Sequence, residues 1–192
     1  MDLSKLRQDI TIKSKLGGQS LELATTYGLF SPKAIDEGTE LLAKYIEVNP
    51  TDNCLDLGCG YGPLGLMLAK AAPSGITHLV DKDFVAIDYS NKNAVLNELP
   101  NATAFLSNGF DQIDPAQKYD IIVSNIPAKI GDELLTLFLH DAYVHLNPGG
   151  KFYIVTISGL KDYMKRRLNE VFGNYNKLKQ SKTYTAAVSI KN

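Results

Sequence analysis

The sequence has no tryptophan and only two cysteines among its 192 residues. Cys54 and Cys59 are too few for the disulfide framework of a small secreted domain, and no closely paired ligands accompany them to hold zinc. We therefore expect both cysteines to pack as small apolar side chains, and we expect no metal site.

Long apolar runs are absent too. No stretch approaches the roughly 20 apolar residues that a membrane-spanning helix needs, and residues 1–13 lack the apolar core of a signal peptide. A cytoplasmic protein without membrane contact is therefore expected. With 44% hydrophobic and 21% charged residues the chain is not of the disordered class. The length predicts one domain, 1–192, in which residues 1–50 lead into a core at 51–192.

The net charge of −1 conceals an uneven distribution. Residues 161–192 hold 8 of the 20 Lys and Arg but only 2 of the 21 Asp and Glu, so this end carries +6 and residues 1–160 carry −7. Such a basic segment either binds a polyanion or forms a solvated helix face. RNA bound through residues 161–182 is one of these two open interpretations.

From Leu55 onward, short apolar runs alternate with segments of helical periodicity, a pattern typical of a parallel sheet covered on both faces. The runs predict strands at Asn53–Leu57, Thr77–Val80, Ala102–Leu106, Asp120–Ser124, Lys151–Ile157 and Ala186–Ile190, with a weaker one at Tyr175–Lys179. The predicted helices are Gly62–Ala72, Phe84–Glu98, Asp132–Leu146 and Leu160–Phe172. Before the first strand, Ser31 as N-cap and Pro32 at the first helical position predict a helix over Pro32–Ile46.

The strongest local signal is the glycine turn Asp56-Leu57-Gly58-Cys59-Gly60-Tyr61-Gly62, between an apolar run and a helical one. Its glycines let the backbone turn tightly and approach a ligand, and the following helix offers free N–H groups. Asp81 ends the second predicted strand, where nucleotide-binding α/β folds have an acid that accepts hydrogen bonds from ribose hydroxyls. We therefore expect Asp81 to bind a ribose, with Asp83 as the second choice.

The same turn indicates which cofactor is bound. Dinucleotide turns commonly read G-x-G-x-x-G, whereas this one reads D-x-G-x-G-x-G and is headed by Asp56. S-adenosylmethionine (SAM) has no phosphate but has a cationic amino group and a sulfonium, which nearby carboxylates favour. After the third strand, Asn108 can hydrogen-bond the adenine edge and Phe110 can cover its ring, although a simple turn explains these residues equally well.

A candidate catalytic loop, Asn125-Ile126-Pro127-Ala128, follows the fourth strand. Ligands of open α/β sheets bind beyond the carboxyl ends of the strands, so this loop belongs on the same rim as the glycine turn. The Asn125 side-chain oxygen and the Ile126 carbonyl can accept hydrogens from a planar amine and aim its lone pair at a methyl donor. Pro127 would stiffen the loop. By itself Asn-x-Pro is a turn, and its position favours the catalytic interpretation.

Together these residues resemble the small-methyltransferase family of class I SAM-dependent methyltransferases, which includes the RsmC-like ribosomal RNA guanine-N2 enzymes. The resemblance covers nearly the whole chain and rests on the segments Gly28–Ser31, Ile35–Leu42, Leu55–Gly65, Val80–Asp81, Ser107–Gly109, Tyr119–Asn125 and Leu168–Asn174. It implies a Rossmann-like α/β fold with a seven-stranded, mostly parallel sheet whose last strand is antiparallel. It also implies a stand-alone form without the second, degenerate domain that several family members carry.

The resemblance implies a set of site residues as well. The catalytic ones are Asn125, Ile126 and Pro127. Those expected at the cofactor are Phe30, Gly38, Asp56, Gly58, Cys59, Gly60, Gly62, Asp81, Lys82, Asn108, Gly109, Phe110 and Asn125. The family's usual loop is Asn-Pro-Pro-aromatic, and here Ile126 replaces the first proline and Ala128 the aromatic. Because stacking on a base is worth roughly 1 to 3 kcal/mol, another aromatic such as Tyr27 or Phe30 would have to replace it.

Three functions remain open at this point. The favoured one is SAM-dependent methylation of an exocyclic amine of an RNA base, of the guanine-N2 type. The altered loop also allows a protein amide or a small molecule as the acceptor. A non-catalytic module that uses the same fold to bind a partner is the third. A nicotinamide-dependent dehydrogenase is disfavoured by the turn pattern and by the lack of a catalytic His or Tyr-Lys pair.

Overall fold

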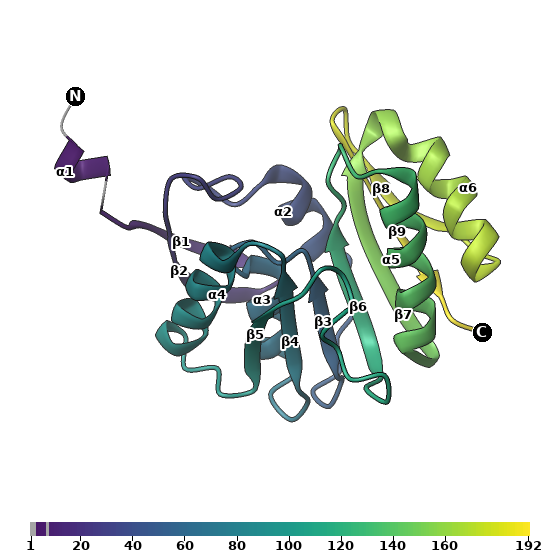
Figure 1. The fold of residues 1–192 in the computed structure, drawn as a ribbon, viewed down its shortest axis with the longest axis horizontal. Helices are drawn as coiled ribbons and strands as arrows, with labels where there is room; N and C mark the ends of the chain where they lie inside the picture. Colours follow the sequence, from purple (N-terminus) through teal and green to yellow (C-terminus); the bar gives the residue numbers. More distant parts are fainter. Residues whose placement is uncertain (1–2, 7) are drawn as a thin grey trace.

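Apolar side chains on both faces of the central strands build a sheet that is buried on two sides. Along β3 (Cys54–Leu57), the side chain of Cys54 belongs to one core and those of Leu55 and Leu57 to the other. The computed structural model describes residues 3–6 and 8–192, and Figure 1 shows their arrangement, with the sheet between two groups of helices.

The sheet has seven strands in the order β5-β4-β3-β6-β7-β9-β8. Besides β3 they are β4 (Thr77–Asp81), β5 (Ala102–Leu106), β6 (Tyr119–Asn125), β7 (Leu146–Ile157), β8 (Asn176–Gln180) and β9 (Tyr184–Ile190). Strands β3 to β7 pair in parallel, and β9 is antiparallel to both β7 and β8. The predicted Rossmann-like sheet with an antiparallel last strand is confirmed.

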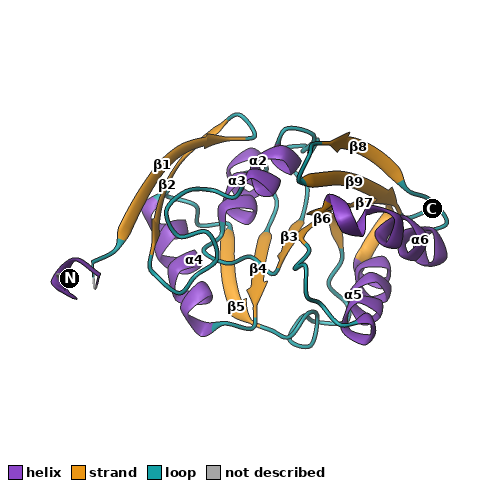
Figure 2. Cartoon of the chain, turned by 90° about the horizontal axis from the view of Figure 1, so that it is seen from above, coloured by secondary structure: helices purple, strands orange, loops and turns teal. Residues whose placement is uncertain are grey.

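Helices cover both faces of this sheet, as Figure 2 shows from above. One face is covered by α2 (Glu37–Ala43), α3 (Pro63–Ala71) and α4 (Phe84–Leu96). The other is covered by α5 (Asp132–His145) and α6 (Lys161–Phe172), the latter preceded by a 3-10 turn at Ser158–Leu160. A further short helix, α1, spans Leu3–Leu6. Among the described residues, no helix is long and apolar enough to cross a membrane.

A hairpin that the sequence analysis did not predict precedes the core. Strands β1 (Ile10–Leu16) and β2 (Gln19–Thr25) pair antiparallel around Gly17 and Gly18, which have φ angles of 54° and 85°. A Gly-Gly pair between two alternating runs is a hairpin signal because both turn residues need positive φ. The signal was therefore present in the sequence.

Asn93 of α4 ties this hairpin to the core. Its side-chain oxygen accepts from the Ala24 N–H (2.7 Å), and its amide donates to the carbonyls of Ala24 (2.8 Å) and Tyr61 (2.9 Å). Asn93 is fully buried. Because all three partners are backbone groups, one side chain fixes β2 against α4 and against the turn before α3.

The predicted start of the lead-in helix is wrong. Ser31 has a φ of 49° and its hydroxyl donates to the Ala34 carbonyl, so it belongs to a turn and not to a helix cap. The helix begins at Glu37, and Asp36 is its N-cap, accepting from the N–H groups of Gly38 and Thr39. Aspartate is also a preferred N-cap residue, and the two backbone bonds that Asp36 accepts decide the boundary.

Candidate active site

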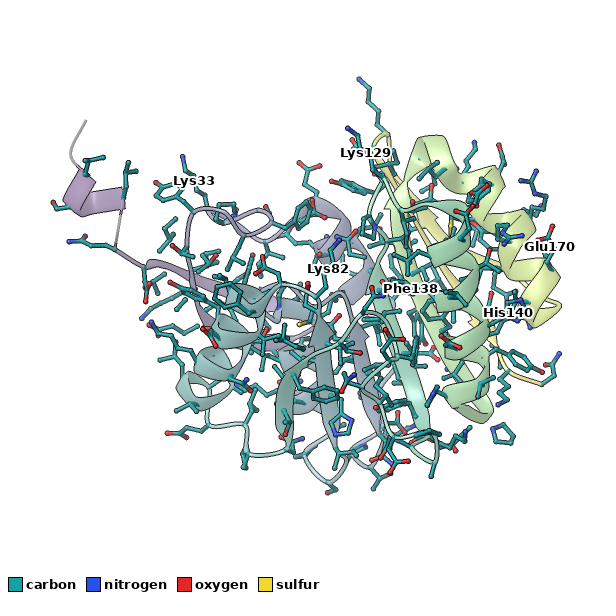
Figure 3. All side chains as sticks on the ribbon, in the orientation of Figure 1. Lys33, Lys82, Lys129, Phe138, His140 and Glu170 are labelled. Carbon is teal, nitrogen blue, oxygen red and sulfur yellow. The ribbon has the colours of Figure 1, made fainter. Side chains whose placement is uncertain are left out.

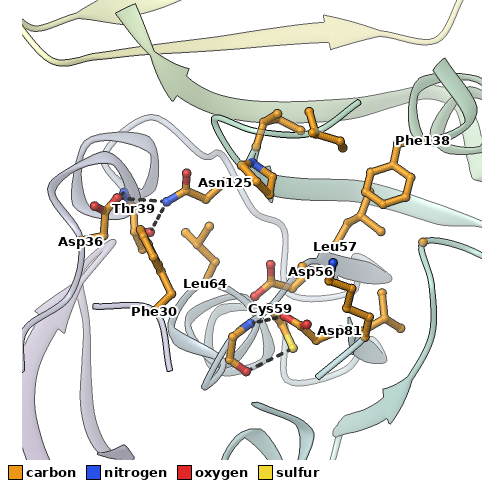
Figure 4. Close-up of a pocket in the computed structure, with 18 of the residues that line it drawn as sticks. Phe30, Asp36, Thr39, Asp56, Leu57, Cys59, Leu64, Asp81, Asn125 and Phe138 are labelled. Atoms are coloured by element: carbon orange, nitrogen blue, oxygen red, sulfur yellow. Dashed lines mark hydrogen bonds between the residues drawn. The ribbon is translucent and has the colours of Figure 1, made fainter. Parts of the chain in front are cut away.

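A cavity of about 690 Å³ lies at the carboxyl ends of β3, β4 and β6. The chain runs outward from β3 through β4 to β5 on one side, and then crosses to β6 on the other side of β3. Open α/β sheets bind ligands at such a reversal of strand order. Figure 4 shows the cavity walls, with Asp81 and Phe138 on one side and Asp36, Phe30 and Asn125 on the other.

The glycine turn forms the floor of this cavity. Gly58 and Gly60 have φ angles of 76° and 56°, and a Cβ on either would meet no atom within 4 Å. Positive φ explains the choice of glycine, and the open space in front of both residues is the cavity itself. The Gly60 N–H donates to Asp81 Oδ2 (2.9 Å), so the turn and the carboxylate at the end of β4 are held together.

Asp56 lies beneath the turn with only 2% of its surface exposed, and its Oδ2 accepts from the Gly65 N–H at 2.7 Å. Burial raises the pKa of this carboxyl to about 7, the nearby Asp81 contributes in the same direction, and the Gly65 bond opposes them. A cation entering the cavity would favour the ionised form. The buried carboxyl therefore suits a positively charged ligand.

An aromatic side chain lines the cavity near Asn108 and Gly109, but it is not the one predicted. Phe110 is 6% exposed and its ring stacks on His145 at 5.0 Å between ring centres, so it belongs to the core beneath α5. Phe138 of α5 lines the cavity instead, and a Cβ on Gly109 would lie 2.5 Å from its ring. The prediction that Phe110 covers an adenine is not supported by its position.

Asn125 ends β6 on the wall formed by the lead-in segment. Its amide nitrogen donates to Asp36 Oδ2 (3.0 Å) and to Thr39 Oγ1 (3.1 Å), as the dashed lines in Figure 4 mark. Tyr184 of β9 donates its hydroxyl to the other Asp36 oxygen at 2.8 Å. This hydrogen bond, with help from burial, raises the pKa of Tyr184 to about 12 and keeps the phenol a donor.

The loop after Asn125 stays hydrogen-bonded to the sheet for one more residue. Ile126 is 2% exposed, and its N–H donates to the Val155 carbonyl of β7 at 2.9 Å. Pro127 and Ala128 are exposed, and both line the cavity. The two residues that depart from the family loop therefore lie at the cavity, one with a buried side chain and one open to it.

Most of the sequence-predicted site residues share this one cavity. Those that line it are Phe30, Asp56, Gly58, Cys59, Gly60, Asp81, Lys82, Asn108, Gly109, Asn125, Ile126 and Pro127. Gly62 and Gly38 do not line it. Gly62 is the left-handed N-cap of α3, and Gly38 packs where a Cβ would lie 2.8 Å from both Asp36 Oδ2 and the Tyr184 ring.

Several lining residues escaped the sequence analysis, among them Asp36, Thr39, Phe138 and Tyr184. Asp36 carries a signal in hindsight, since aspartate is a preferred N-cap residue that accepts from the N–H groups two and three positions later. The other three carry none, because only the fold brings them to the cavity.

The donor set fits SAM. An acid at the ribose position, a buried carboxyl, an open glycine turn and an apolar wall that includes Leu57 and Phe138 offer groups for the sugar, the cationic end and the adenine. The two cysteines are free and buried. In the part of the chain that the structure describes, no group of three His, Cys, Asp or Glu side chains could hold a metal ion.

Comparison with known proteins finds methyltransferases among the proteins that this chain resembles. The chain is 32% identical to the uncharacterized protein YbxB of Bacillus subtilis over 142 residues, which are 73% of this chain and 71% of that protein. It is 33% identical to ribosomal RNA small subunit methyltransferase C of Haemophilus influenzae over 180 residues, which are 90% of this chain and 53% of that enzyme.

A solved structure with the same fold is that of the 16S rRNA N2 methyltransferase RsmC of T. thermophilus in complex with AdoMet and guanosine. It matches with a TM-score of 0.86 at 27% identity, over 96% of this chain and 51% of that one. The chain thus spans about half the length of the ribosomal RNA methyltransferases it matches. AdoMet, the cofactor of that complex, is the one expected here from the glycine turn.

The family that the sequence resembles is confirmed by a match over residues 20–187. This match covers most of the chain, including the glycine turn, Asp81 and Asn125. The chain belongs to the methyltransferase small domain family.

Proposed function

We propose that the protein transfers a methyl group from SAM to an exocyclic amine of an RNA base, of the guanine-N2 type. The observation that carries this proposal is that Asn125 lines the same cavity as Asp81 and the glycine turn. The guanosine in the complex of the similar T. thermophilus enzyme supports the choice of base.

Several residues would hold the cofactor. The Asp81 carboxylate would accept hydrogen bonds from the ribose, Asn108 would bond the adenine edge, and Phe138 would cover the adenine ring. Asp56 would stabilise the cationic end through the field of its buried carboxylate. When bound, SAM supplies an activated methyl group, so the protein needs only to align the acceptor and exclude water.

Asn125 would orient the acceptor. Its side-chain oxygen and the Ile126 carbonyl would accept the two hydrogens of a planar amine, so that the nitrogen lone pair points at the methyl donor. Phe30 is 65% exposed and lines the cavity on the Asn125 side, whereas Tyr27 does not line it. We assign to Phe30 the stacking contact with the base that Ala128 cannot make.

The RNA backbone would follow basic side chains around the cavity. Lys82 and Lys129 line it, and Figure 3 shows Lys33 and Lys129 along the upper edge of the molecule, with Lys82 further inside. In the basic segment 161–182, Lys182 lies in the turn before Tyr184, a cavity residue. Arg166 and Arg167 instead pair with Glu170, at 3.9 and 2.7 Å. The Lys182 end of the segment is therefore the better candidate for phosphate contacts.

The test is transfer of a tritiated methyl group from SAM into separate RNA, protein and small-molecule fractions, followed by nucleoside mass spectrometry of the RNA. N2-methylguanosine is the expected product. Asn125→Ala should lower turnover by roughly 100-fold, because a misaligned acceptor loses most of the benefit of positioning. Asn49→Ala, in the exposed turn before β3, is the matched control and should leave turnover unchanged.

Two results would contradict the proposal. Label found only in the protein or small-molecule fraction would exclude RNA as the acceptor. Turnover of Asn125→Ala within about threefold of wild type would exclude the assigned alignment role.

A further inference from the structure

We infer that Asp36 is a positioning residue, which fixes the orientation of the Asn125 amide so that its oxygen is the atom presented to the acceptor amine. The inference rests on the proposed function and deepens it. It concerns a carboxylate from the lead-in segment, 89 positions before Asn125 in the sequence.

Four donors converge on the Asp36 carboxylate. Its Oδ2 accepts from the N–H groups of Gly38 (2.9 Å) and Thr39 (3.2 Å) and from the Asn125 amide (3.0 Å). Its Oδ1 accepts from the Tyr184 hydroxyl (2.8 Å). The carboxylate is thus held from α2, β6 and β9 together, so it has little freedom to turn away from Asn125.

This arrangement decides which end of the amide faces Asp36. An ionised carboxylate only accepts hydrogen bonds, so the –NH₂ of Asn125 must point at it and the oxygen must point elsewhere. Thr39 Oγ1 accepts the second amide hydrogen at 3.1 Å. No donor in the described residues reaches the Asn125 oxygen, which is therefore the amide group left for a ligand.

Helix capping alone does not explain these contacts. An N-cap needs only to accept from the first backbone N–H groups of its helix, which a serine also does. The bonds from Asn125 and Tyr184 are additional, and Gly38 leaves the space in which the Tyr184 ring lies. The cap therefore belongs to a hydrogen-bonded cluster of side chains that all line the cavity: Asp36, Thr39, Asn125 and Tyr184.

Asp36→Ser separates the two roles. Serine retains the cap but is too short to reach Asn125 and Tyr184. We expect kcat to fall roughly 10- to 100-fold with the KM for SAM within about twofold of wild type, because alignment and not cofactor binding is lost. Asp36→Asn should keep most activity, since its oxygen can replace Oδ2 and the Tyr184 hydroxyl can turn to accept.

Two further variants make the test specific. Glu40→Gln removes a charge from the exposed side of the same helix and should leave kcat unchanged. In an Asn125→Ala background, Asp36→Ser should cost less than about twofold, because the group that it positions is already gone. An equal loss in both backgrounds, or a raised KM for SAM at unchanged kcat, would overturn the inference.

One readout does not depend on the acceptor. In protein labelled with ¹⁵N-asparagine, the Asn125 side-chain amide should show slowed hydrogen exchange in wild type and Glu40→Gln, and fast exchange in Asp36→Ser. An exposed, rapidly exchanging amide in wild type would refute the positioning role even if RNA is the substrate. Conversely, a protected amide with no methylation of RNA would refute the proposed function and leave the Asp36 contact standing.

Discussion

Replacing the buried Asp56 with asparagine should stabilise the protein at neutral pH and weaken its hold on a cationic cofactor. Asp56 is 2% exposed, and its pKa is raised from 3.8 to about 7, chiefly by burial. Asparagine keeps an oxygen that can accept from the Gly65 N–H. The substitution therefore removes the charge with little change in shape.

The magnitude follows from the pKa difference. A carboxyl whose pKa is higher in the folded than in the unfolded state does not lower folding stability when the pH is below its unfolded pKa, because both states are then protonated. As the pH rises from about 4 to about 7, the unfolded state ionises first and folding stability falls by about 1.4 kcal/mol per pH unit. The full difference, about 4 kcal/mol, is reached above pH 7 and is an upper value, because asparagine is also costly to bury.

The measurement is urea unfolding of wild type and Asp56→Asn from pH 4 to 8, with the difference in unfolding free energy plotted against pH. The difference in unfolding free energy, variant minus wild type, should increase up to about pH 7 and then level off. Asp88→Asn, on the exposed side of α4, is the matched control and should give a flat plot. A flat plot for Asp56→Asn would refute the burial argument. Calorimetric titration with SAM should show weaker binding by the variant at pH 8.

Two further predictions follow from the contacts described above. Asn93→Ala leaves three buried backbone groups without partners, so it should lower the unfolding free energy by about 3 kcal/mol and Tm by roughly 6 to 12 °C. The control is Val95→Ala on the same helix, where the side chain is 81% exposed, and its stability should equal that of wild type within error. Lys129→Ala and Lys182→Ala should each weaken RNA binding and reduce its salt dependence by about one counterion, whereas Lys118→Ala, near the opposite edge of the sheet, should not. Wild-type binding that is insensitive to salt would rule out the phosphate contacts.

The parts of the site that lie at strand ends could be predicted from the sequence. Four of the site residues lie at or just after the carboxyl end of a predicted strand: Asp56, Gly60, Asp81 and Asn125. Parallel strands bring their carboxyl ends to one edge of the sheet. Position along the chain therefore implied position in space. The alternation of apolar runs with helical periodicity likewise predicted the sheet and the helices that cover it.

The other cavity residues could not be placed in this way. On α5, Leu135 and Leu139 face the core, while Leu134 and Phe138, one position earlier on the next strip of the helix, face the cavity. Which of two neighbouring strips reaches a ligand depends on how the helix is rotated against the sheet. Local periodicity does not record that rotation, and this is why Phe138 was not found.

The altered candidate loop is compatible with the alignment role proposed for Asn125. A proline after the asparagine, as in the family's usual loop, would stiffen the chain but would have no N–H to donate. Ile126 has one, and its bond to the Val155 carbonyl extends the β6–β7 pairing by a residue beyond Asn125. The buried Ile126 side chain adds a second anchor on the core side. The sheet thus supplies the rigidity that the ring would give, and only the aromatic lost at Ala128 must come from elsewhere, for which Phe30 is exposed on the cavity wall.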